Sequence, residues 1–297
     1  MKFYIVTPTF NSLEWLQRCV RSVADQVCDG VQVHHHVQDG VSKDGTPEWL
    51  AQWQQYARDI PGYTFSFESA RDRGMYDAIN IAWSKMPDDA DVTAHLNSDE
   101  QYLPQALARL AEAFAARPEA DIMLASHIVL DAQERYICHR WPVSPWRWVS
   151  QNVCEMVTCA CFHRVGAFRR HGLRFGDCWR SIGDLVLYRD ILSTCPTVCT
   201  LPGVFSTTFT VTGNNLGWSE VTEREWQVYR SGLSPLSRCT AGIARLVGKF
   251  KRRLPDFFNA APKEYAVYPV AAECRTRHEI KHPTSHWGCR SEGQTES

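Results

Sequence analysis

Strand-like and helix-like patterns of apolar residues alternate along the chain up to residue 116. Four short runs, rich in β-branched and aromatic residues, are typical of buried parallel strands; they cover residues 3–8, 31–37, 63–67 and 91–96. Each is followed by a stretch with apolar residues at helical spacing; these cover residues 13–26, 46–56, 77–85 and 103–114. This order predicts an α/β fold in which a doubly wound sheet is flanked by helices.

The pattern becomes mixed after residue 116. Further strands are predicted in residues 122–125, 135–140, 157–162, 198–201 and 204–211, with helices near residues 164–171 and 184–192. We expect one domain with two halves, residues 1–100 and residues 101–216. A helical extension, residues 217–269, follows it. Residues 270–297 are polar and lack periodicity, so they are expected to form a disordered tail.

The extension contains a candidate basic amphipathic helix at residues 236–254. Apolar and basic side chains alternate there at helical spacing, namely Ile243, Leu246, Val247, Phe250 and Leu254 among Arg245, Lys249, Lys251, Arg252 and Arg253. Such a helix either lies on an anionic membrane surface or packs on the domain with a solvated basic face. The sequence leaves both interpretations open.

Composition restricts the class of protein. A net charge of −1 over 297 residues gives no basic surface for nucleic acid. No apolar run is long enough to span a membrane, and no signal peptide precedes the first strand. A cytoplasmic location is therefore expected, with peripheral binding to the inner face of the membrane as a variant. The 12 cysteines are expected to be reduced, because the chain is large and lacks a secretory signal.

Each of the four predicted strands leads into a polar turn. The turns are residues 9–11, 39–46, 68–74 and 97–100, and the last three carry carboxylates. Ligands of open α/β sheets bind beyond the carboxyl ends of the strands, so these turns predict one anionic pocket. Hard oxygen ligands in such a pocket suit a divalent cation, Mn²⁺ or Mg²⁺, that carries a phosphorylated ligand.

Three of these segments resemble motifs of the family 2 glycosyltransferases, which have the GT-A fold. Residues 39–46 resemble the Asp-Gly-x-Ser-x-Asp-Gly-Thr turn of that family. Residues 71–80 are similar to its Asp-x-Gly-Ile-Tyr-Asp-Ala-Met-Asn segment, and residues 96–100 resemble its Asp-x-Asp metal motif with Asn in first place. The resemblance implies a GT-A fold, a Rossmann-like mixed sheet flanked by helices, here with a helical C-terminal extension.

The resemblance also implies a set of ligand-binding residues. Asp99 is the implied ligand of the divalent cation, and Asp39 is expected to accept a hydrogen bond from a uracil-like base. Arg71 or Arg73 would reach the diphosphate. The implied nucleotide-binding residues are Thr7, Pro8, Asn11, Asp39, Arg71, Asp72, Arg73, Asn97 and Ser98.

Simpler structural roles compete with these assignments. Asp39 and Asp44 both suit tight turns before glycine. The two arginines beside Asp72 would neutralise it in a salt bridge. Asp77 suits a helix cap, and Glu100 either caps its own turn or binds the cation through water.

Asp184 is the predicted general base. An inverting transfer needs a group that takes the proton of the acceptor hydroxyl. Asp184 stands before the leucine-rich run 185–191, and its position matches the acid that family members carry before a similar helix. As alternatives, Asp184 is an ordinary helix cap, or Asp177 supplies the base.

These features together predict an inverting, non-processive glycosyltransferase. It would move a sugar from a nucleotide-sugar, UDP-linked, to a saccharide or lipid-linked saccharide, as in surface polysaccharide biosynthesis. The chain has no Gln-x-x-Arg-Trp segment, which argues against a processive synthase. One alternative is a sugar-1-phosphate nucleotidyltransferase, although the turn after the first strand is not glycine-rich and basic. The other alternative is a catalytically silent nucleotide-sugar-binding protein, which stays possible because Asn97 replaces the first acid of the metal motif.

Overall fold

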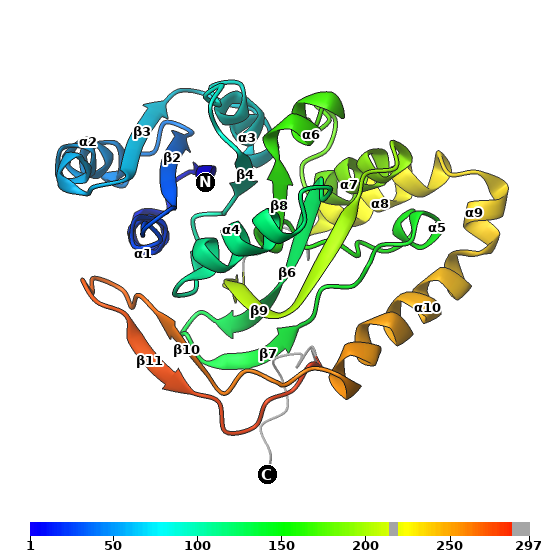
Figure 1. Ribbon diagram of the computed structural model, residues 1–297. Helices are drawn as coiled ribbons and strands as arrows, with labels where there is room; N and C mark the ends of the chain where they lie inside the picture. Colours follow the sequence, from blue (N-terminus) through cyan, green and yellow to red (C-terminus); the bar gives the residue numbers. More distant parts are fainter. Residues whose placement is uncertain (214–218, 287–297) are drawn as a thin grey trace, which may run out of the picture.

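The computed structural model describes residues 1–213 and 219–286 and centres on a nine-stranded mixed sheet (Figure 1). The strands run in the order β3-β2-β1-β4-β8-β6-β9-β5, and β7 also pairs with β6. The first half contains β1 Lys2–Thr9, β2 Gln32–Asp39, β3 Tyr63–Ser69 and β4 Val92–His95. These four strands are parallel, so their carboxyl ends meet at the same edge.

Antiparallel and parallel pairings mix in the second half of the sheet. Its strands are β5 Gln101–Tyr102, β6 Ile122–Asp131, β7 Tyr136–Arg140, β8 Cys161–Arg164 and β9 Val198–Val211. β8 joins the halves, because it runs antiparallel to both β4 and β6. The two strands predicted at 198–201 and 204–211 are one strand. β9 pairs with β6 both before and after residues 202–204, and the pairing register shifts between Ala125 and His127.

Helices cover both faces of the sheet, as predicted. One face carries α1 Leu13–Ala24, α2 Thr46–Tyr56 and α4 Ala106–Ala116, and the other carries α3 Met75–Trp83, α6 Val165–Arg170 and α7 Gly183–Ser193. Successive strand residues point to opposite faces, so β1 serves both cores: Phe3 and Ile5 face the first, and Tyr4 and Val6 face the second. This three-layer arrangement confirms the predicted α/β class.

The strand predicted at 157–162 is wrong in its first half. Thr158–Ala160 forms a 3₁₀ turn, and β8 begins only at Cys161. The turn is buried, and the Thr207 hydroxyl lies 3.5 Å from the Cys159 sulfur, a contact across the sheet that a local pattern does not encode. None of the cysteines within the described ranges forms a disulfide, in agreement with the expected reduced thiols.

The C-terminal extension is helical, but residues 236–254 do not form one helix. Its helices are α8 Glu220–Ser231, α9 Pro235–Cys239 and α10 Ala241–Arg253, and α10 packs beside the short α5 Arg147–Ser150. The break lies at Thr240, whose backbone N–H and hydroxyl both donate to the Leu236 carbonyl at 2.9 Å. No helix within the described residues combines the length and apolar character that crossing a bilayer requires.

A β-hairpin occupies part of the region where a disordered tail was expected. Strand β10 Glu264–Val267, within the segment expected to be helical, pairs with β11 Thr276–Glu279, within the expected tail, so both expectations are wrong for these residues. The hairpin is ordered by apolar burial, in a cluster that contains Leu103, Ile128, Leu130, Tyr265, Val267 and Ile280. The polar composition of the tail does not reveal this cluster, because half of it comes from other parts of the chain. Residues 287–297 lie outside the described residues.

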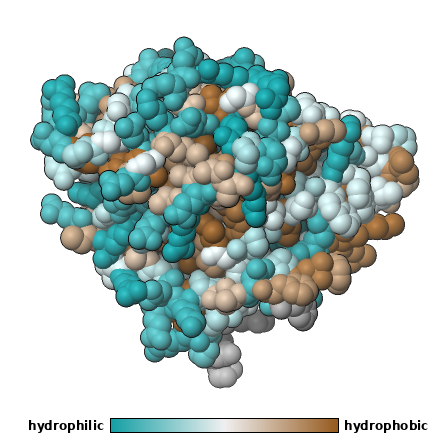
Figure 2. All heavy atoms as spheres, in the orientation of Figure 1, coloured by the Kyte–Doolittle hydropathy of each residue, from teal (hydrophilic) through white to brown (hydrophobic). Residues whose placement is uncertain are grey.

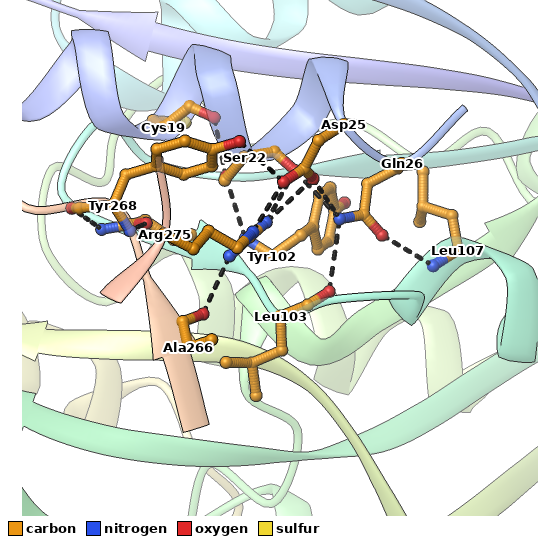
Figure 3. Close-up of polar contacts among 11 residues, drawn as sticks. Cys19, Ser22, Asp25, Gln26, Tyr102, Leu103, Leu107, Ala266, Tyr268 and Arg275 are labelled. Atoms are coloured by element: carbon orange, nitrogen blue, oxygen red, sulfur yellow. Dashed lines mark hydrogen bonds and ion pairs between the residues drawn. The ribbon is translucent and has the colours of Figure 1, made fainter. Parts of the chain in front are cut away.

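Polar contacts tie the hairpin to the end of α1 (Figure 3). The Arg275 guanidinium donates to both oxygens of Asp25, at 2.6 and 2.9 Å, and the Tyr268 hydroxyl donates to the same carboxylate at 2.9 Å. Gln101 exchanges two hydrogen bonds with the backbone of Tyr268, at 2.8 and 3.1 Å. The last strand pair is therefore fixed to the first helix and to β5.

Arg275→Ala is expected to lower the free energy of unfolding by about 1.5–3 kcal/mol, because it removes charge-assisted hydrogen bonds at a mostly buried pair. Arg277→Ala is the matched control: its exposed ion pair with Glu264 should contribute less than about 1 kcal/mol. Urea unfolding followed by tryptophan fluorescence measures both variants. Equal losses would show that Asp25 does not hold the hairpin.

Candidate active site

The turns after β1, β2 and β3 meet at the carboxyl edge of the sheet. A Cβ added to Gly40 would lie 3.0 Å from Asp72 Oδ2 and 3.2 Å from a ring carbon of Phe10, so all three turns touch at this point. Asn11 fastens the first turn to the second, because its Oδ1 accepts the Lys43 N–H at 2.8 Å. The predicted meeting of these turns is therefore present in the structure.

Asp39 is fully buried at the end of β2, and its carboxylate is saturated by hydrogen bonds. Ser42 donates its backbone N–H and its hydroxyl, the latter at 2.5 Å, and Ser69 donates its hydroxyl at 2.5 Å. Asp39 therefore stabilises its own turn, which is the structural role proposed as the alternative to base recognition. Recognition of a base by Asp39 stays a prediction, and it requires one of the serine hydroxyls to turn away.

Thr7 and Pro8 are buried within β1. The Thr7 hydroxyl lies 2.9 Å from His35 Nε2, in the sheet interior. The Thr7 hydroxyl therefore faces the sheet interior, and the assignment of Thr7 and Pro8 to nucleotide binding stays a prediction. Pro8 does not end the strand: β1 stays paired with β2 through Thr9, and the turn begins one residue later.

The arginines beside Asp72 do not neutralise it. The Arg73 guanidinium lies 2.6 Å from Asp77 Oδ1 and 2.9 Å from Asp177 Oδ1, and Arg71 is exposed without an ion pair to any described residue. Asp72 accepts a backbone N–H of its own turn at 2.8 Å, and burial raises its pKa. Asp72 is therefore placed to accept a ligand hydrogen bond, and Arg71 is placed to contact an anion.

The turn after β4 carries two adjacent carboxylates, of which Glu100 is buried and Asp99 is partly exposed. Glu100 is 1% exposed and its Oε2 accepts the Asn97 N–H at 2.8 Å, so Glu100 caps the turn. Burial raises the pKa of Asp99 and of Glu100, and the negative charge of Asp99 raises that of Glu100 further. Ser98 Oγ lies 3.3 Å from Ser12 Oγ, which places this turn against the start of α1.

Asn97 and Asp99 fit a divalent cation. Asn97 Oδ1 is buried and has no hydrogen-bond partner among the described residues, which is unfavourable for an amide oxygen without a ligand. Within the described ranges no three His, Cys, Asp or Glu side chains converge, so the donor set is one carboxylate and one amide oxygen. That set suits Mg²⁺ or Mn²⁺, which keep water and phosphate oxygens as further ligands.

Asp184 lies in the first turn of α7. Its Oδ1 accepts the Leu185 N–H at 2.8 Å, and its Oδ2 lies 3.9 Å from the Cys154 sulfur. Burial raises the pKa of Asp184, which suits a group that must take up a proton during a reaction. Asp177, the alternative base, is half exposed and pairs with the guanidinium groups of Arg73 and Arg174.

One short segment lies near both acidic centres. The Cys159 thiol contacts the Glu100 carboxyl group. Two residues further on, the side chain of Cys161 lies close enough to Asp184 for the charge of that carboxylate to raise the thiol pKa. Glu100, in the turn that carries Asn97 and Asp99, and Asp184 therefore both lie near the start of β8.

Two residues without a predicted role position Asp184. The Tyr76 hydroxyl donates to the Ser181 carbonyl at 2.9 Å, and its oxygen lies 3.4 Å from the Asp184 N–H. Glu225 of α8 accepts three successive backbone N–H groups before α7, at 2.6, 2.9 and 3.0 Å. Tyr76 lies within a family-like segment, but nothing in the sequence marks Glu225, because its partners are backbone groups distant in sequence.

The fold and this acidic edge define a glycosyltransferase of the GT-A type. The sequence model of Glycosyl transferase family 2 matches residues 4–174, more than half of the chain, and the protein belongs to that family. No curated protein sequence matches the chain.

Solved structures resemble the protein at low sequence identity. Staphylococcus aureus TarS 1–349 in complex with UDP-GlcNAc is 16% identical, with a TM-score of 0.59; the match covers 84% of this chain and 73% of that one. The mannosyltransferase PcManGT from Pyrobaculum calidifontis, in complex with GDP-Man and Mn²⁺, is 16% identical with a TM-score of 0.57 and coverage of 86% and 73%. These likenesses establish the shared GT-A fold.

Gly183→Ala should displace the start of α7, because the new Cβ would lie 2.5 Å from the Tyr76 ring. We expect a loss of about 1–3 kcal/mol in unfolding free energy, the usual effect of overpacking, together with a fall in activity. Gly166→Ala is the control: its Cβ meets nothing within 4 Å, and alanine within helix α6 should stabilise by about 0.5–1 kcal/mol. Thermal melts and sugar-transfer rates of both variants test this packing, and an active, stable Gly183→Ala protein would contradict it.

Proposed function

We propose that this protein moves a sugar from a UDP-linked nucleotide-sugar to a saccharide or lipid-linked saccharide, with inversion at the anomeric carbon and without processive elongation. The observation that supports this best is that two incompletely bonded acidic centres lie near the start of β8. Asn97 and Asp99 belong to one of them, and Asp184 is the other. Such a transfer needs charge neutralisation at the leaving group and a base at the acceptor.

Asp184 is the proposed base. Its carboxylate takes the proton of the acceptor hydroxyl while that oxygen attacks the anomeric carbon from the face opposite the leaving nucleotide. Tyr76 and Glu225 hold the backbone on which it stands. Because burial raises the pKa of Asp184, the base form is lost as pH falls through that pKa, and turnover should fall with it on the acid side.

Asp99 and Asn97 are the proposed ligands of the divalent cation. Bound there, Mn²⁺ or Mg²⁺ would neutralise the charge that builds on the departing nucleoside diphosphate. Arg71, which has no ion pair within the described residues, provides a second cationic contact for the diphosphate.

The nucleoside is proposed to bind where the first three turns meet. The Phe10 side chain is 63% exposed there and offers a ring for stacking. Asp72 offers a carboxylate that no arginine neutralises, which suits the N–H donor of a uracil base. Two solved structures with this fold hold UDP-GlcNAc and GDP-Man, which supports a nucleotide-sugar donor.

We further propose that the protein meets a lipid-linked acceptor at the inner membrane surface, in surface polysaccharide biosynthesis. α10 turns an apolar stripe outward: Ile243, Leu246 and Phe250 are 59%, 67% and 63% exposed. Figure 2 shows this hydrophobic band along the lower right of the molecule, over α10. Exposed Lys249 and Arg253 lie on the same helix, so the surface complements an anionic bilayer.

Asp99→Ala should abolish Mn²⁺-dependent binding of the preferred nucleotide-sugar, because it removes the carboxylate ligand. Asp184→Asn should retain binding and lose turnover by roughly 10²–10⁴-fold, the usual contribution of a general base. Calorimetry and transfer assays across a panel of UDP- and GDP-linked hexoses and N-acetylhexosamines measure both quantities. Asp177→Asn is the control and should leave turnover close to that of the wild type.

Failure of the wild type to bind any nucleotide-sugar in the presence of Mn²⁺ would overturn the transferase function. Binding without transfer or hydrolysis in the wild type would instead favour a silent binding protein.

Ile243→Asp combined with Phe250→Asp should weaken binding to phosphatidylglycerol vesicles by more than about tenfold, since inserting either side chain contributes about 1.5–3 kcal/mol. Tyr56→Asp is the control, because Tyr56 is equally exposed at the end of α2, far from α10 (Figure 1). Vesicle co-sedimentation measures both variants. If the wild type does not bind anionic vesicles, membrane docking through α10 is excluded.

A further inference from the structure

A basic cavity lies beside α10 and borders the apolar stripe at Leu246. Its volume is about 680 Å³, within the range of small-molecule sites. Four cationic side chains line it: Arg230 from α8, and Arg245, Lys249 and Arg252 from α10. The spacing of the last three, four and then three residues apart, places them on one face of the helix.

The cations of this cavity lack carboxylate partners. None of the four forms an ion pair with a carboxylate of the described residues, and no Asp or Glu lines the cavity. Like charges gathered in this way repel one another. Lys251, on the same helix, shows the contrast: it is buried and its Nζ lies 2.6 Å from Glu155 Oε1. The fold neutralises the cation that anchors α10 and leaves four others facing the cavity.

The cavity reaches the candidate base. Cys154 lines the cavity, and its sulfur lies 3.9 Å from Asp184 Oδ2. Trp226 forms part of the wall, and the Arg230 guanidinium carbon lies 5.0 Å from the centre of its ring, which limits the orientations of Arg230. Cys154 is therefore the residue that separates an anion bound at this end of the cavity from Asp184.

We propose that this cavity binds a phosphate or diphosphate group carried by the acceptor, close to the hydroxyl that receives the sugar. The proposal rests on the transferase function above and adds the chemical class of the acceptor, a phosphorylated saccharide. Guanidinium groups match phosphate oxygens in paired hydrogen bonds. Four cations exceed what one carboxylate would neutralise, which favours a multiply charged group. Leu246 lines the cavity and belongs to the apolar stripe, so a lipid attached to the phosphate would run along α10.

The test titrates inorganic diphosphate into the full chain by calorimetry in EDTA, so that divalent cations do not bring the probe to Asp99. The wild type should bind it at one site. Arg245→Gln with Lys249→Gln should weaken that affinity by at least about tenfold, since each lost charge-assisted contact contributes 1.5–3 kcal/mol. Arg238→Gln with Arg253→Gln removes the same charge from exposed positions outside the cavity, and should leave the affinity close to wild type.

Mn²⁺-dependent donor binding, measured on the same proteins, separates the two proposals. The cavity proposal is overturned if the wild type binds the donor but not diphosphate, or if both double variants lose diphosphate affinity equally. Either result leaves the transferase function intact. A wild type that binds no nucleotide-sugar overturns both. The cavity proposal is supported if the Arg245 and Lys249 substitutions weaken diphosphate binding and the control substitutions do not.

Vesicles distinguish the source of the phosphate. Phosphatidic acid in phosphatidylcholine presents a phosphate monoester at a lipid surface. If free diphosphate releases the wild type from these vesicles, the cavity takes its phosphate from a lipid headgroup. If diphosphate binds to the protein but does not release it, the phosphate belongs to a water-soluble acceptor. Both results support the cavity as a phosphate site.

Discussion

A carboxylate buried at the edge of a sheet must be hydrogen-bonded or carry a raised pKa, and this constraint organises the site. Asp39 and Glu100 meet it through hydroxyl and N–H donors from nearby turns, so they make those turns rigid. Asp99 and Asp184 meet it incompletely, and burial raises the pKa of each. Glu100 accepts the Asn97 N–H and its pKa is raised as well, so the hydrogen bond fixes the turn without cancelling the effect of burial. Asp99 and Asp184 are the carboxylates that we propose bind a cation and a proton.

The C-terminal extension is part of the same site. Glu225 of α8 holds the loop before α7, and the buried pair of Lys251 with Glu155 anchors α10 beside it. The hairpin is fixed to α1, the helix that carries Arg18; the charge of Arg18 favours the ionised form of Asp99. Arg18 in turn donates to the Tyr268 carbonyl at 2.8 Å. The C-terminal part of the chain thus supports both the loop before α7 and the helix that carries Arg18.

Elements with a strong local pattern were predicted close to their observed bounds. Strands β1 to β4 and helices α1 and α7 combine continuous apolar runs or helical spacing within one segment, and no distant partner is needed to recognise them. The unbroken strand β9, the interruption at Thr240 and the final hairpin were not predicted. The first depends on pairing with β6 and the third on apolar side chains from β6, whereas the contacts of Thr240 do not account for the second.

The sequence alone determined the α/β class and the order of polar turns at one sheet edge, because contiguous residues encode these features. It also predicts Asp99 and Asp184 as the principal acids of the site. Only the tertiary structure decided which side chains face the pocket. It turned Thr7 toward His35, paired Arg73 with Asp77, and gathered cations from α8 and α10 beside Cys154. These outcomes depend on packing and charge between segments distant in the chain, and no local pattern of residues carries that free energy.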